Sequence, residues 1–344
     1  MITCNTRVLT SELTGVQRYT LELLARFNGN IETVKPDMPL NGIKGHVWEQ
    51  FILPAKIKGK LLWSPSNTGP LTVKKQVVSI MDLSPMDHPE WMGKQFSAWY
   101  GFLTPRLVKQ VCGVLTLSEF SKQRIIHYCP DAESKIHVVH LAADKRFAPS
   151  DMSEIPKMLE HLSIPTPHYL VALGSLEPRK NLGRLLQAWK NIVSKVPDDV
   201  WLVLAGAQGK KLVFGDQSFE KLPPRVHLTG HVPDELLPTL YSGAIGSVYV
   251  SLYEGFGLPP LEAMSCGTAV LASNLTSLPE VVGDAALTVN PYDVDAISDG
   301  LMRLINDSIL RKNLQNKGLK QAKKFSWDKT AEQTLEVLTQ AARS

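Results

Sequence analysis

Short runs of apolar residues recur along the chain, and most are followed by a polar turn and then by apolar positions three to four residues apart. Continuous runs are typical of strands buried in a parallel sheet, and the longer spacing is typical of amphipathic helices. Their alternation predicts an α/β fold with helices on both faces of parallel sheets. The predicted strands cover residues 76–80, 111–117, 136–141, 169–173, 200–205, 225–229, 247–250 and 269–272, and predicted helices cover 182–196, 327–342 and a segment from 261 onward.

The pattern weakens between residues 147 and 168, where proline clusters flank a short helical segment. Proline-rich punctuation without a strand pattern is typical of a linker between domains. The length of 344 residues also suits two domains rather than one. We therefore predict an N-terminal domain over 1–148 and a C-terminal domain over 165–326, followed by a final helix within 327–344.

Composition narrows the functional classes. The hydrophobic share of 44% and charged share of 20% are ordinary for a globular protein, and no apolar run reaches the ~20 residues of a membrane helix. Without an apolar signal region at the start, a cytoplasmic protein is expected. The four cysteines lack CxxC spacing, which argues against a zinc site and a disulfide framework.

Charge is uneven along the chain. Residues 1–150 carry 18 Lys and Arg against 12 Asp and Glu, whereas the remainder carries 19 against 21. A basic first half can face phosphates or anionic lipid, or it can simply be a solvated surface. No dense run of Lys and Arg is present, so nucleic acid is not an expected partner.

The most informative segment covers residues 251–264, where a strand, a loop and a helix start follow one another. Gly255 and Gly257 allow close approach of a ligand to the backbone, and the helix start offers amides to a phosphate. Glu262, about one turn into the helix, can accept hydrogen bonds from ribose hydroxyls, and Glu254 lies on the loop before it. Two acids at this spacing are more often solvated or capping, but the glycines and the setting favour a nucleotide site.

Two further segments support that site. Arg179 and Lys180 follow another strand and can neutralise a diphosphate, although exposed cations at an ordinary helix start would look the same. The presence of the glutamate segment about 75 residues later favours the diphosphate interpretation. Gly15 precedes an early helix that can face the donor phosphates, but Thr14 can equally be a plain helix cap.

Together these segments resemble the family 4 glycosyltransferases, which have the GT-B fold: α/β, with two Rossmann-like parallel-sheet domains facing across a cleft. The resemblance covers nearly the whole chain. Its central motif is the family's E-x7-E pattern, here Glu254 to Glu262. The other matching stretches are residues 117–122, 226–232, 273–286 and 325–327.

The resemblance implies a retaining transferase that binds a nucleotide diphosphate sugar mainly on its C-terminal domain. Lys180, with Arg179, would hold the diphosphate; Glu262 would bind the ribose and Glu254 the donor sugar. The final helix would cross back to the N-terminal domain. The implied catalytic residues are Glu254 and Lys180, and the implied donor-binding residues are Gly15, Arg179, Lys180, Val232, Glu254, Phe256, Gly257, Leu258 and Glu262.

Two positions depart from the family pattern. Many relatives have arginine where this chain has Ser175, which leaves more of the diphosphate charge to Lys180 and its neighbour. Many also have histidine where this chain has Met81, and that histidine usually touches the donor sugar. Asp82 or His88 could take its place. These departures keep open an alternative, a catalytically silent nucleotide-sugar-binding partner of a transferase complex.

No cofactor or metal is expected beyond the nucleotide sugar itself. Residues 293–295 form a DxD triplet, but they precede a helix, so capping explains them. The resemblance implies GDP-mannose as donor and a lipid-linked saccharide acceptor, in O-antigen or capsule assembly. A dehydrogenase is disfavoured, because no GxGxxG turn follows an early strand.

The segment 96–103 is rich in aromatic residues and is followed by Arg106 and Lys109. Such a helix can contact a membrane surface that bears the acceptor, which would place the protein peripherally on the inner face of the cytoplasmic membrane. The alternative, which we favour at this stage, is a core helix of the first domain.

Overall fold

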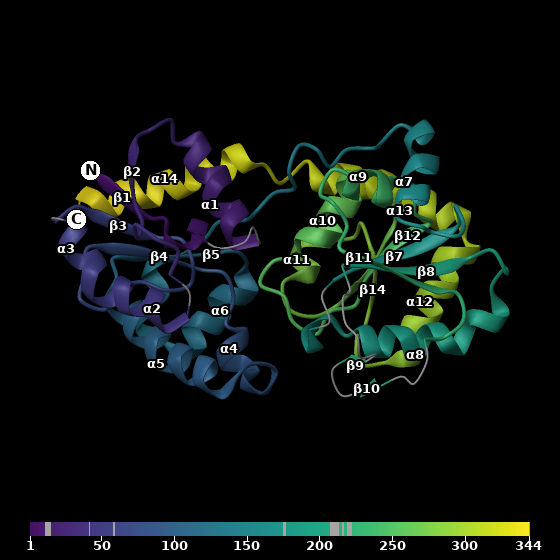
Figure 1. The fold of residues 1–344 in the computed structure, drawn as a ribbon, viewed down its shortest axis with the longest axis horizontal. Helices are drawn as coiled ribbons and strands as arrows, with labels where there is room; N and C mark the ends of the chain where they lie inside the picture. Colours follow the sequence, from purple (N-terminus) through teal and green to yellow (C-terminus); the bar gives the residue numbers. More distant parts are fainter. Residues whose placement is uncertain are drawn as a thin grey trace. The chain divides into compact units, whose positions relative to one another are not determined.

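The computed structural model describes residues 1–10, 15–40, 42–57, 59–174, 177–206, 213–214, 217–218 and 222–343. These residues form two compact units, one made of Met1–Leu141 with Ser326–Ser344 and the other of Ala142–Phe325. Each unit contains a six-stranded parallel sheet with helices packed on it, as the ribbon shows (Figure 1). The predicted α/β fold with two Rossmann-like parallel sheets is therefore confirmed.

In the first unit the strand order is β2-β1-β3-β4-β5-β6, and all neighbours are parallel. The final helix α14 (Trp327–Arg343) packs on α1 and on three strands of this sheet, which explains why the chain's end belongs to the first unit. The strands are β1 (Ile2–Asn5), β2 (Ile31–Val34), β3 (Leu61–Ser64), β4 (Gln76–Ile80), β5 (Gly113–Thr116) and β6 (Ile136–Val138). The helices are α1 (Gly15–Arg26), α2 (Gly42–Val47), the π-helix η2 (Trp48–Ile52), α3 (Leu53–Ile57), α4 (Ser84–Asp87), α5 (Lys94–Gln110) and α6 (Glu119–Tyr128), with 3-10 turns η1 (Arg7–Thr10), η3 (Pro89–Trp91) and η4 (Pro130–Lys135).

In the second unit the order is β11-β8-β7-β12-β13-β14, again parallel throughout. Counted along the chain within this sheet, the order is 3-2-1-4-5-6, the doubly wound arrangement of dinucleotide-binding domains. Its strands are β7 (Tyr169–Leu173), β8 (Trp201–Ala205), β11 (Val226–Gly230), β12 (Gly246–Tyr249), β13 (Val270–Ser273) and β14 (Leu287–Val289), and β9 (Val213–Phe214) and β10 (Gln217–Ser218) form a separate antiparallel pair. The helices are α7 (Ile155–His161), α8 (Leu182–Ile192), α9 (Leu237–Ser242), α10 (Leu258–Ser265), α11 (Leu278–Val282), α12 (Val294–Asn306) and α13 (Ser308–Ala322), with 3-10 turns η5 (Met152–Glu154), η6 (Pro178–Lys180) and η7 (Val193–Lys195).

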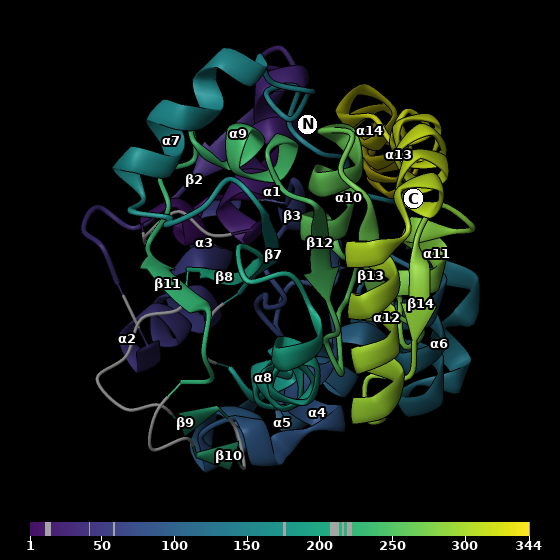
Figure 2. The same cartoon turned by 90° about the vertical axis from the view of Figure 1, so that its right-hand side faces the viewer.

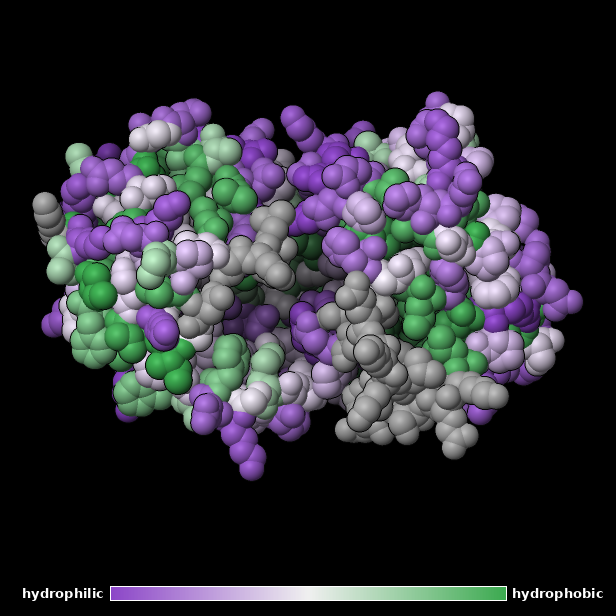
Figure 3. Space-filling view, viewed as in Figure 1, coloured by the Kyte–Doolittle hydropathy of each residue, from purple (hydrophilic) through white to green (hydrophobic). Residues whose placement is uncertain are grey.

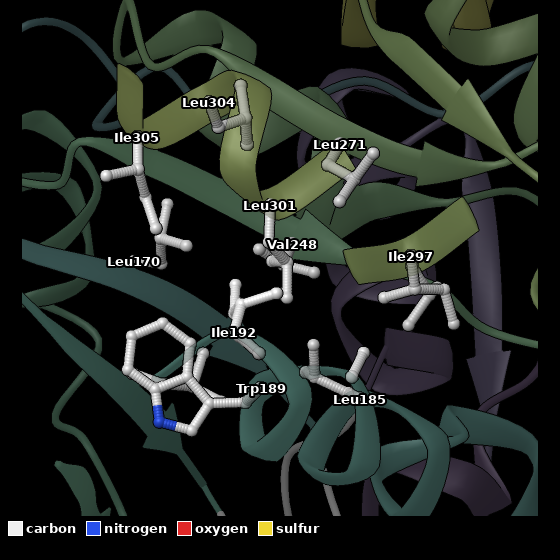
Figure 4. Close-up of a cluster of buried hydrophobic side chains, with 14 of the residues drawn as sticks. Leu170, Leu185, Trp189, Ile192, Val248, Leu271, Ile297, Leu301, Leu304 and Ile305 are labelled. Carbon is white, nitrogen blue, oxygen red and sulfur yellow. The ribbon is translucent and has the colours of Figure 1, made fainter. Parts of the chain in front are cut away.

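Alternate side chains of the second sheet enter two separate cores, because successive residues of a strand point to opposite faces. Leu170 and Val248 pack with α8 and α12, where Trp189 is fully buried (Figure 4). Tyr169 and Val171 pack with α7, α9 and α10 on the other face. Figure 2 shows α8 and α12 along the same side of this sheet. Apolar burial on both faces explains why these strands form near-continuous apolar runs.

The structure differs from the sequence prediction in three respects. The division between units falls after Leu141, earlier than the predicted boundary at residue 148. The segment 147–168, interpreted as a linker, belongs to the second unit, because Phe147, Ile155 and Met158 are buried in its core. The strands β1, β2, β3 and β14 were not predicted.

Candidate functional site

The second sheet has a topological switch point between β7 and β12. The two strands are neighbours, yet α8 follows β7 on one face of the sheet and α10 follows β12 on the other. Loops that leave adjacent strands toward opposite faces open a crevice beyond the carboxyl ends, where doubly wound folds bind ligands. The predicted cation segment follows β7 and the predicted glutamate segment follows β12. Sequence segments about 75 residues apart thus meet at one place.

At this place Lys180, Arg179 and Glu254 form one ion cluster. Lys180 Nζ donates to Glu254 Oε1 at 2.8 Å, and Arg179 Nη1 donates to Glu254 Oε2 at 3.1 Å. Tyr249, the last residue of β12, joins them: its hydroxyl lies 2.6 Å from Lys180 Nζ and 2.9 Å from Glu254 Oε1. Arg179 also pairs with Glu177 at 2.6 Å. We call Arg179, Lys180, Tyr249 and Glu254 the switch-point cluster.

Burial and charge act in opposite directions on this cluster. Burial by itself would raise the pKa of the Glu254 carboxyl, but the charges of Lys180 and Arg179 outweigh it, and the pKa lies below the ordinary value. Burial would likewise lower the pKa of Lys180, but the charge of Glu254 leaves that pKa raised. Burial and then the Glu254 charge raise the pKa of Tyr249 to about 12. At neutral pH, Lys180 and Arg179 are therefore positively charged, Glu254 is negatively charged and Tyr249 is neutral. The four side chains of the cluster together carry a net charge of plus one.

The hydrogen-bond inventory shows what the cluster can still bind. An ammonium has three donors, and Lys180 directs two of them to described partners, Tyr249 and Glu254. A carboxylate offers about four acceptor sites, and Glu254 receives three described side-chain bonds, from Lys180, Tyr249 and Arg179. Within the described part of the chain, one lysine donor and one carboxylate site are left over, which suits a phosphate oxygen and a sugar hydroxyl.

Hydrogen bonds to the backbone hold the segment that carries Arg179 and Lys180 in place. After the 3-10 turn η6, Asn181 takes the left-handed conformation (φ 57°), which asparagine tolerates better than most residues. Its buried side-chain amide donates to the carbonyls of Val250 (3.0 Å) and Pro291 (2.7 Å). The Leu252 amide donates to the Arg179 carbonyl at 2.8 Å. These bonds connect the loop after β7 directly to the loop after β12, so the cations do not depend on their own ion pairs for position.

The loop before α10 requires glycine at one position. Gly257 has φ 122°, and a Cβ there would lie 2.6 Å from a methyl carbon of Leu278. The Ser277 hydroxyl lies 2.9 Å from the Glu254 carbonyl oxygen and 2.6 Å from that of Phe256, which holds the loop against α11. With the loop fixed in this way, the backbone enters α10 sharply and close to the switch-point cluster.

Helix α10 begins at Leu258, earlier than the predicted residue 261, and has prolines in its first turn. The first amides of a helix have no partner within it and lie at the positive end of the helix dipole, so they attract anions. Glu262, half-buried, lies about one turn further along. Phe256 and Gly257 are buried in the loop that precedes the helix. The elements expected for a phosphate and a ribose thus follow Glu254 directly in the chain.

Two predicted donor-binding residues, Val232 and Gly15, lie outside the switch-point cluster. Val232, which follows β11, is 5% exposed and packs in the core beside α9. Gly15 is the exposed first residue of α1 in the first unit, where an added Cβ would meet no described atom within 4 Å. Ser175 lies outside the described residues, as does Thr14. Their roles in donor binding stay predictions.

Met81, where many relatives have histidine, lies in the first unit together with Asp82 and His88. Met81 is buried, and its amide donates to Asn67 Oδ1 at 2.6 Å. Asp82 accepts from the amide and hydroxyl of Ser84 at the start of α4, and His88 stacks on Trp91 and contacts Glu90. Both candidates for replacing the family histidine are thus engaged locally.

The DxD triplet is a helix cap, as predicted. The Asp293 carboxylate accepts from the Ala296 amide at 3.0 Å, at the start of α12. Across the described residues, no group of three or more His, Cys, Asp and Glu side chains could hold a metal ion. No described helix is both long and apolar enough to cross a bilayer.

Sequence reasoning missed Tyr249, Asn181 and Ser277. Asn181 and Ser277 position the two loops, whereas Tyr249 contacts the charged groups themselves. The available signal for Tyr249 was its place at the end of a buried strand, immediately before the glutamate loop, since residues there reach the carboxyl edge of the sheet. Nothing in the sequence alone indicates that Asn181 and Ser277 connect segments far apart in the chain.

Comparisons with known proteins bear on the fold and on the family. The model of the family described as "Glycosyl transferases group 1" matches residues 155–321. The O-antigen chain mannosyltransferase B of Escherichia coli is 36% identical over 272 residues, covering 77% of this chain and 70% of that protein. Among solved structures, the sucrose-phosphate synthase of Thermosynechococcus elongatus aligns with a TM-score of 0.77 at 18% identity, covering 98% of both chains. The Anabaena protein HepE in complex with UDP-glucose aligns at 0.74 and 17%, covering 98% of this chain and 99% of that one. These likenesses confirm the predicted GT-B fold.

Proposed function

The chain belongs to the group 1 glycosyl transferases and is a hexosyltransferase, and from this premise we propose that it transfers mannose from GDP-mannose to a saccharide acceptor. We further propose that the acceptor is lipid-linked and that the product is part of an O-antigen or a similar surface polysaccharide. The observation that carries the proposal is the switch-point cluster beside the start of α10. The choice of mannose and of O-antigen rests on the name of the Escherichia coli relative.

In the proposed complex, the diphosphate contacts the backbone amides of Gly257 and Leu258 at the start of α10. On its other side it contacts the side chains of Lys180 and Arg179. Glu262 accepts hydrogen bonds from the ribose. The available acceptor site of Glu254 binds a hydroxyl of the mannose. Val232 and Gly15 would complete the donor site near the base and the phosphates, respectively.

The proposed chemistry needs no metal and no dedicated general base. The acceptor hydroxyl oxygen forms a bond to the anomeric carbon while the bond from that carbon to the phosphate oxygen breaks. The proton of the hydroxyl moves to the departing phosphate oxygen on the same face of the sugar, so the anomeric configuration is retained. Charge grows on the diphosphate as the bond breaks, and Lys180 and Arg179, already fixed near it, stabilise that charge without reorganisation.

A second candidate is a silent nucleotide-sugar-binding partner of another transferase. It is favoured by one observation: Met81, where relatives have a histidine, is buried and cannot donate a hydrogen bond to the sugar. In that case the donor would bind tightly but would be neither hydrolysed nor transferred.

A thermal-shift screen against GDP-, UDP-, dTDP- and ADP-sugars tests the donor, because a ligand that binds only the folded state raises its melting temperature. The proposal expects the largest shift with GDP-mannose. Radiolabelled GDP-mannose with a lipid-linked saccharide then tests transfer, and NMR of the product tests retention. A larger shift with another nucleotide would refute the donor, and binding without turnover would favour the silent partner.

A further inference from the structure

An apolar groove lies on the first unit, and none of its lining residues belongs to the switch-point cluster. Its cavity has a volume of about 760 Å³ and lies between α2 with the π-helix η2 on one side and α5 on the other. Apolar surface dominates its walls. The large apolar side chains that line it include Ile43, Val47, Phe51, Phe96 and Trp99.

The rim of this groove exposes large apolar side chains. Ile43 is 79% exposed and Phe51 77%, and Val47, Ile52, Phe96 and Phe102 are each close to half exposed. Every exposed phenylalanine of the described residues is in this set. Figure 3 shows hydrophobic side chains gathered on the face where α2 and α5 lie. Single exposed apolar residues are ordinary, but a contiguous group of this kind marks an interaction surface.

Exposed cations are frequent in the segments that form the groove, and exposed acids are absent from these segments. The groove is built from residues 42–57, 69–75 and 94–110, all of them described, and the one acid in these ranges, Glu49, is fully buried and paired with Arg7. The exposed cations of the same ranges are Lys44, Lys56, Lys74, Lys75, Lys94, Arg106 and Lys109. We call this surface, apolar rim and cations together, the basic aromatic face.

Side-chain contacts extend the face along α5. The Trp99 and Phe102 rings stack at 6.0 Å, and the Arg106 guanidinium lies 3.9 Å from the centre of the Phe102 ring. Residues 99, 102 and 106 are three to four positions apart and therefore share one side of the helix. The helix thus presents aromatic rings next to the apolar groove, with a cation beyond them. The helix buries Leu103 in the first unit, as expected of a core helix, and exposes Phe96 and Phe102 on its other side.

We propose that the basic aromatic face docks on the surface of an anionic phospholipid bilayer. Aromatic side chains favour the interfacial region of a bilayer, where one end is apolar and the other wet, and cations are attracted to anionic headgroups. A second copy of this chain is a poorer occupant, because a symmetric contact would place like charges opposite one another. The proposal goes beyond the transfer reaction and does not depend on which sugar is moved.

Two independent contributions set the expected affinity. Each Lys or Arg near an anionic surface is worth about 1 kcal/mol, a factor of about five in partition. Inserting one large exposed side chain such as Phe51 contributes about tenfold or more. Because the cations act through screened charge, raising the salt should weaken docking strongly, whereas the apolar contribution should persist.

The test is co-sedimentation of the full chain with vesicles. One set contains phosphatidylcholine alone and the other contains one part phosphatidylglycerol to two parts phosphatidylcholine. We expect binding to the anionic set, weakened between about 0.1 M and about 1 M salt, where the Debye length falls from about 10 Å to about 3 Å. The double variant Lys44→Glu with Lys94→Glu should lower the partition coefficient at least about tenfold.

Matched variants separate docking from folding. Phe51→Ser should lower binding about tenfold, whereas Ile309→Ser, which changes an 82% exposed residue of α13 in the other unit, should not. Lys190→Glu on α8 is the charge control. All variants should keep the same thermal shift with nucleotide sugar, because none of these residues is in the donor site.

Three outcomes would overturn the proposal. Wild type could bind neutral and anionic vesicles equally, or the Lys44→Glu/Lys94→Glu variant could bind as wild type does. Sedimentation velocity without lipid could also show a dimer that Phe51→Ser dissociates, which would assign the face to a second copy. Failure of sugar transfer with intact vesicle binding would count against the proposed function and leave the docking surface standing.

Discussion

Each unit has a buried glutamate that pairs with an arginine near the switch point of its sheet, which lies between β1 and β3 in the first sheet and between β7 and β12 in the second. The two glutamates differ in the groups that surround the carboxylate. In the first unit, Glu49 of η2 receives a bond from Asn5 at the end of β1 (2.7 Å) and lies 3.4 Å from Arg7. Its carboxyl is fully enclosed. In the second unit, Glu254 has Lys180 and Arg179 as partners and lies on a glycine-containing loop that leads into a helix start.

The comparison teaches that an ion pair at a sheet edge does not by itself make a ligand site. Burial would raise the pKa of the Glu49 carboxyl, but the nearby His46 side chain and the Arg7 charge leave that pKa lowered, as for Glu254. The electrostatics of the two clusters are therefore alike. What differs is the backbone: Glu254 lies on a loop that enters helix α10 through Gly257, whereas Glu49 lies within η2. We infer that Glu49 holds the first unit together, whereas Glu254 serves the donor.

The largest expected effect concerns stability. Glu49→Ala would leave Arg7 without its buried partner and should lower the free energy of unfolding by about 3–5 kcal/mol. Glu22→Ala, which removes a half-exposed pair with Arg26, should cost less than about 1 kcal/mol. Urea unfolding, with hydrogen exchange of the β1 and β3 amides, measures both. Weakened donor binding in folded Glu49→Ala protein would erase the contrast between the two clusters.

The next effect concerns turnover. Lys180→Ala removes a fixed cation from the departing diphosphate and should lower kcat by roughly 10²–10³. Lys190→Ala on the exposed side of α8 is the matched control and should leave kcat unchanged. Initial rates with saturating nucleotide sugar check this, after circular dichroism has confirmed folding. A kcat within twofold of wild type would remove Lys180 from the mechanism.

A smaller effect concerns donor affinity. Glu262→Ala should weaken donor binding at least about tenfold, or about 1.4 kcal/mol, because a ribose contact is lost. Asp295→Ala changes an exposed acid of the same unit and should leave affinity unaltered. Titration calorimetry with GDP measures both variants. If Glu262→Ala and Lys180→Ala both bind the donor as tightly as wild type, the site is misassigned.

The smallest expected effect is the response to pH. The pKa of Glu254 is lowered and that of Lys180 is raised, so neither group titrates near neutrality and affinity for a nucleotide sugar should stay flat from about pH 6 to about pH 9.

The shifted pKa values of Glu254 and Lys180 also determine how the free energy of unfolding changes with pH. The contribution of Glu254 is present above the ordinary carboxyl pKa and is lost as the pH falls through its lower folded value. The contribution of Lys180 is present below the ordinary lysine pKa and is lost as the pH rises through its raised value. Calorimetric affinities between about pH 6 and about pH 9 test the flat donor affinity, and melting temperatures below about pH 4 and above about pH 10 test the two stability contributions. A donor affinity that titrates near pH 7 would contradict the first expectation.

Sequence patterns predicted most strands of both sheets but missed β1, β2 and β3 of the first sheet and β14 of the second. The strands β4 and β7 begin and end where predicted, because both are largely buried and rich in apolar residues. The edge strands β2 and β14 are partly exposed and short, so their residues resemble loops. The boundary between units was placed too late, because proline punctuation does not reveal that Phe147 is buried.

The sequence by itself determined the α/β class, the cations at 179–180, the Glu254 and Glu262 spacing and the glycines between them, because each depends on local pattern and on residue chemistry. The tertiary structure decided that strand order puts β7 beside β12, that Tyr249 completes the cluster and that aromatic residues of α5 face outward. Those features depend on contacts between segments far apart in the chain, and such contacts have no local signature.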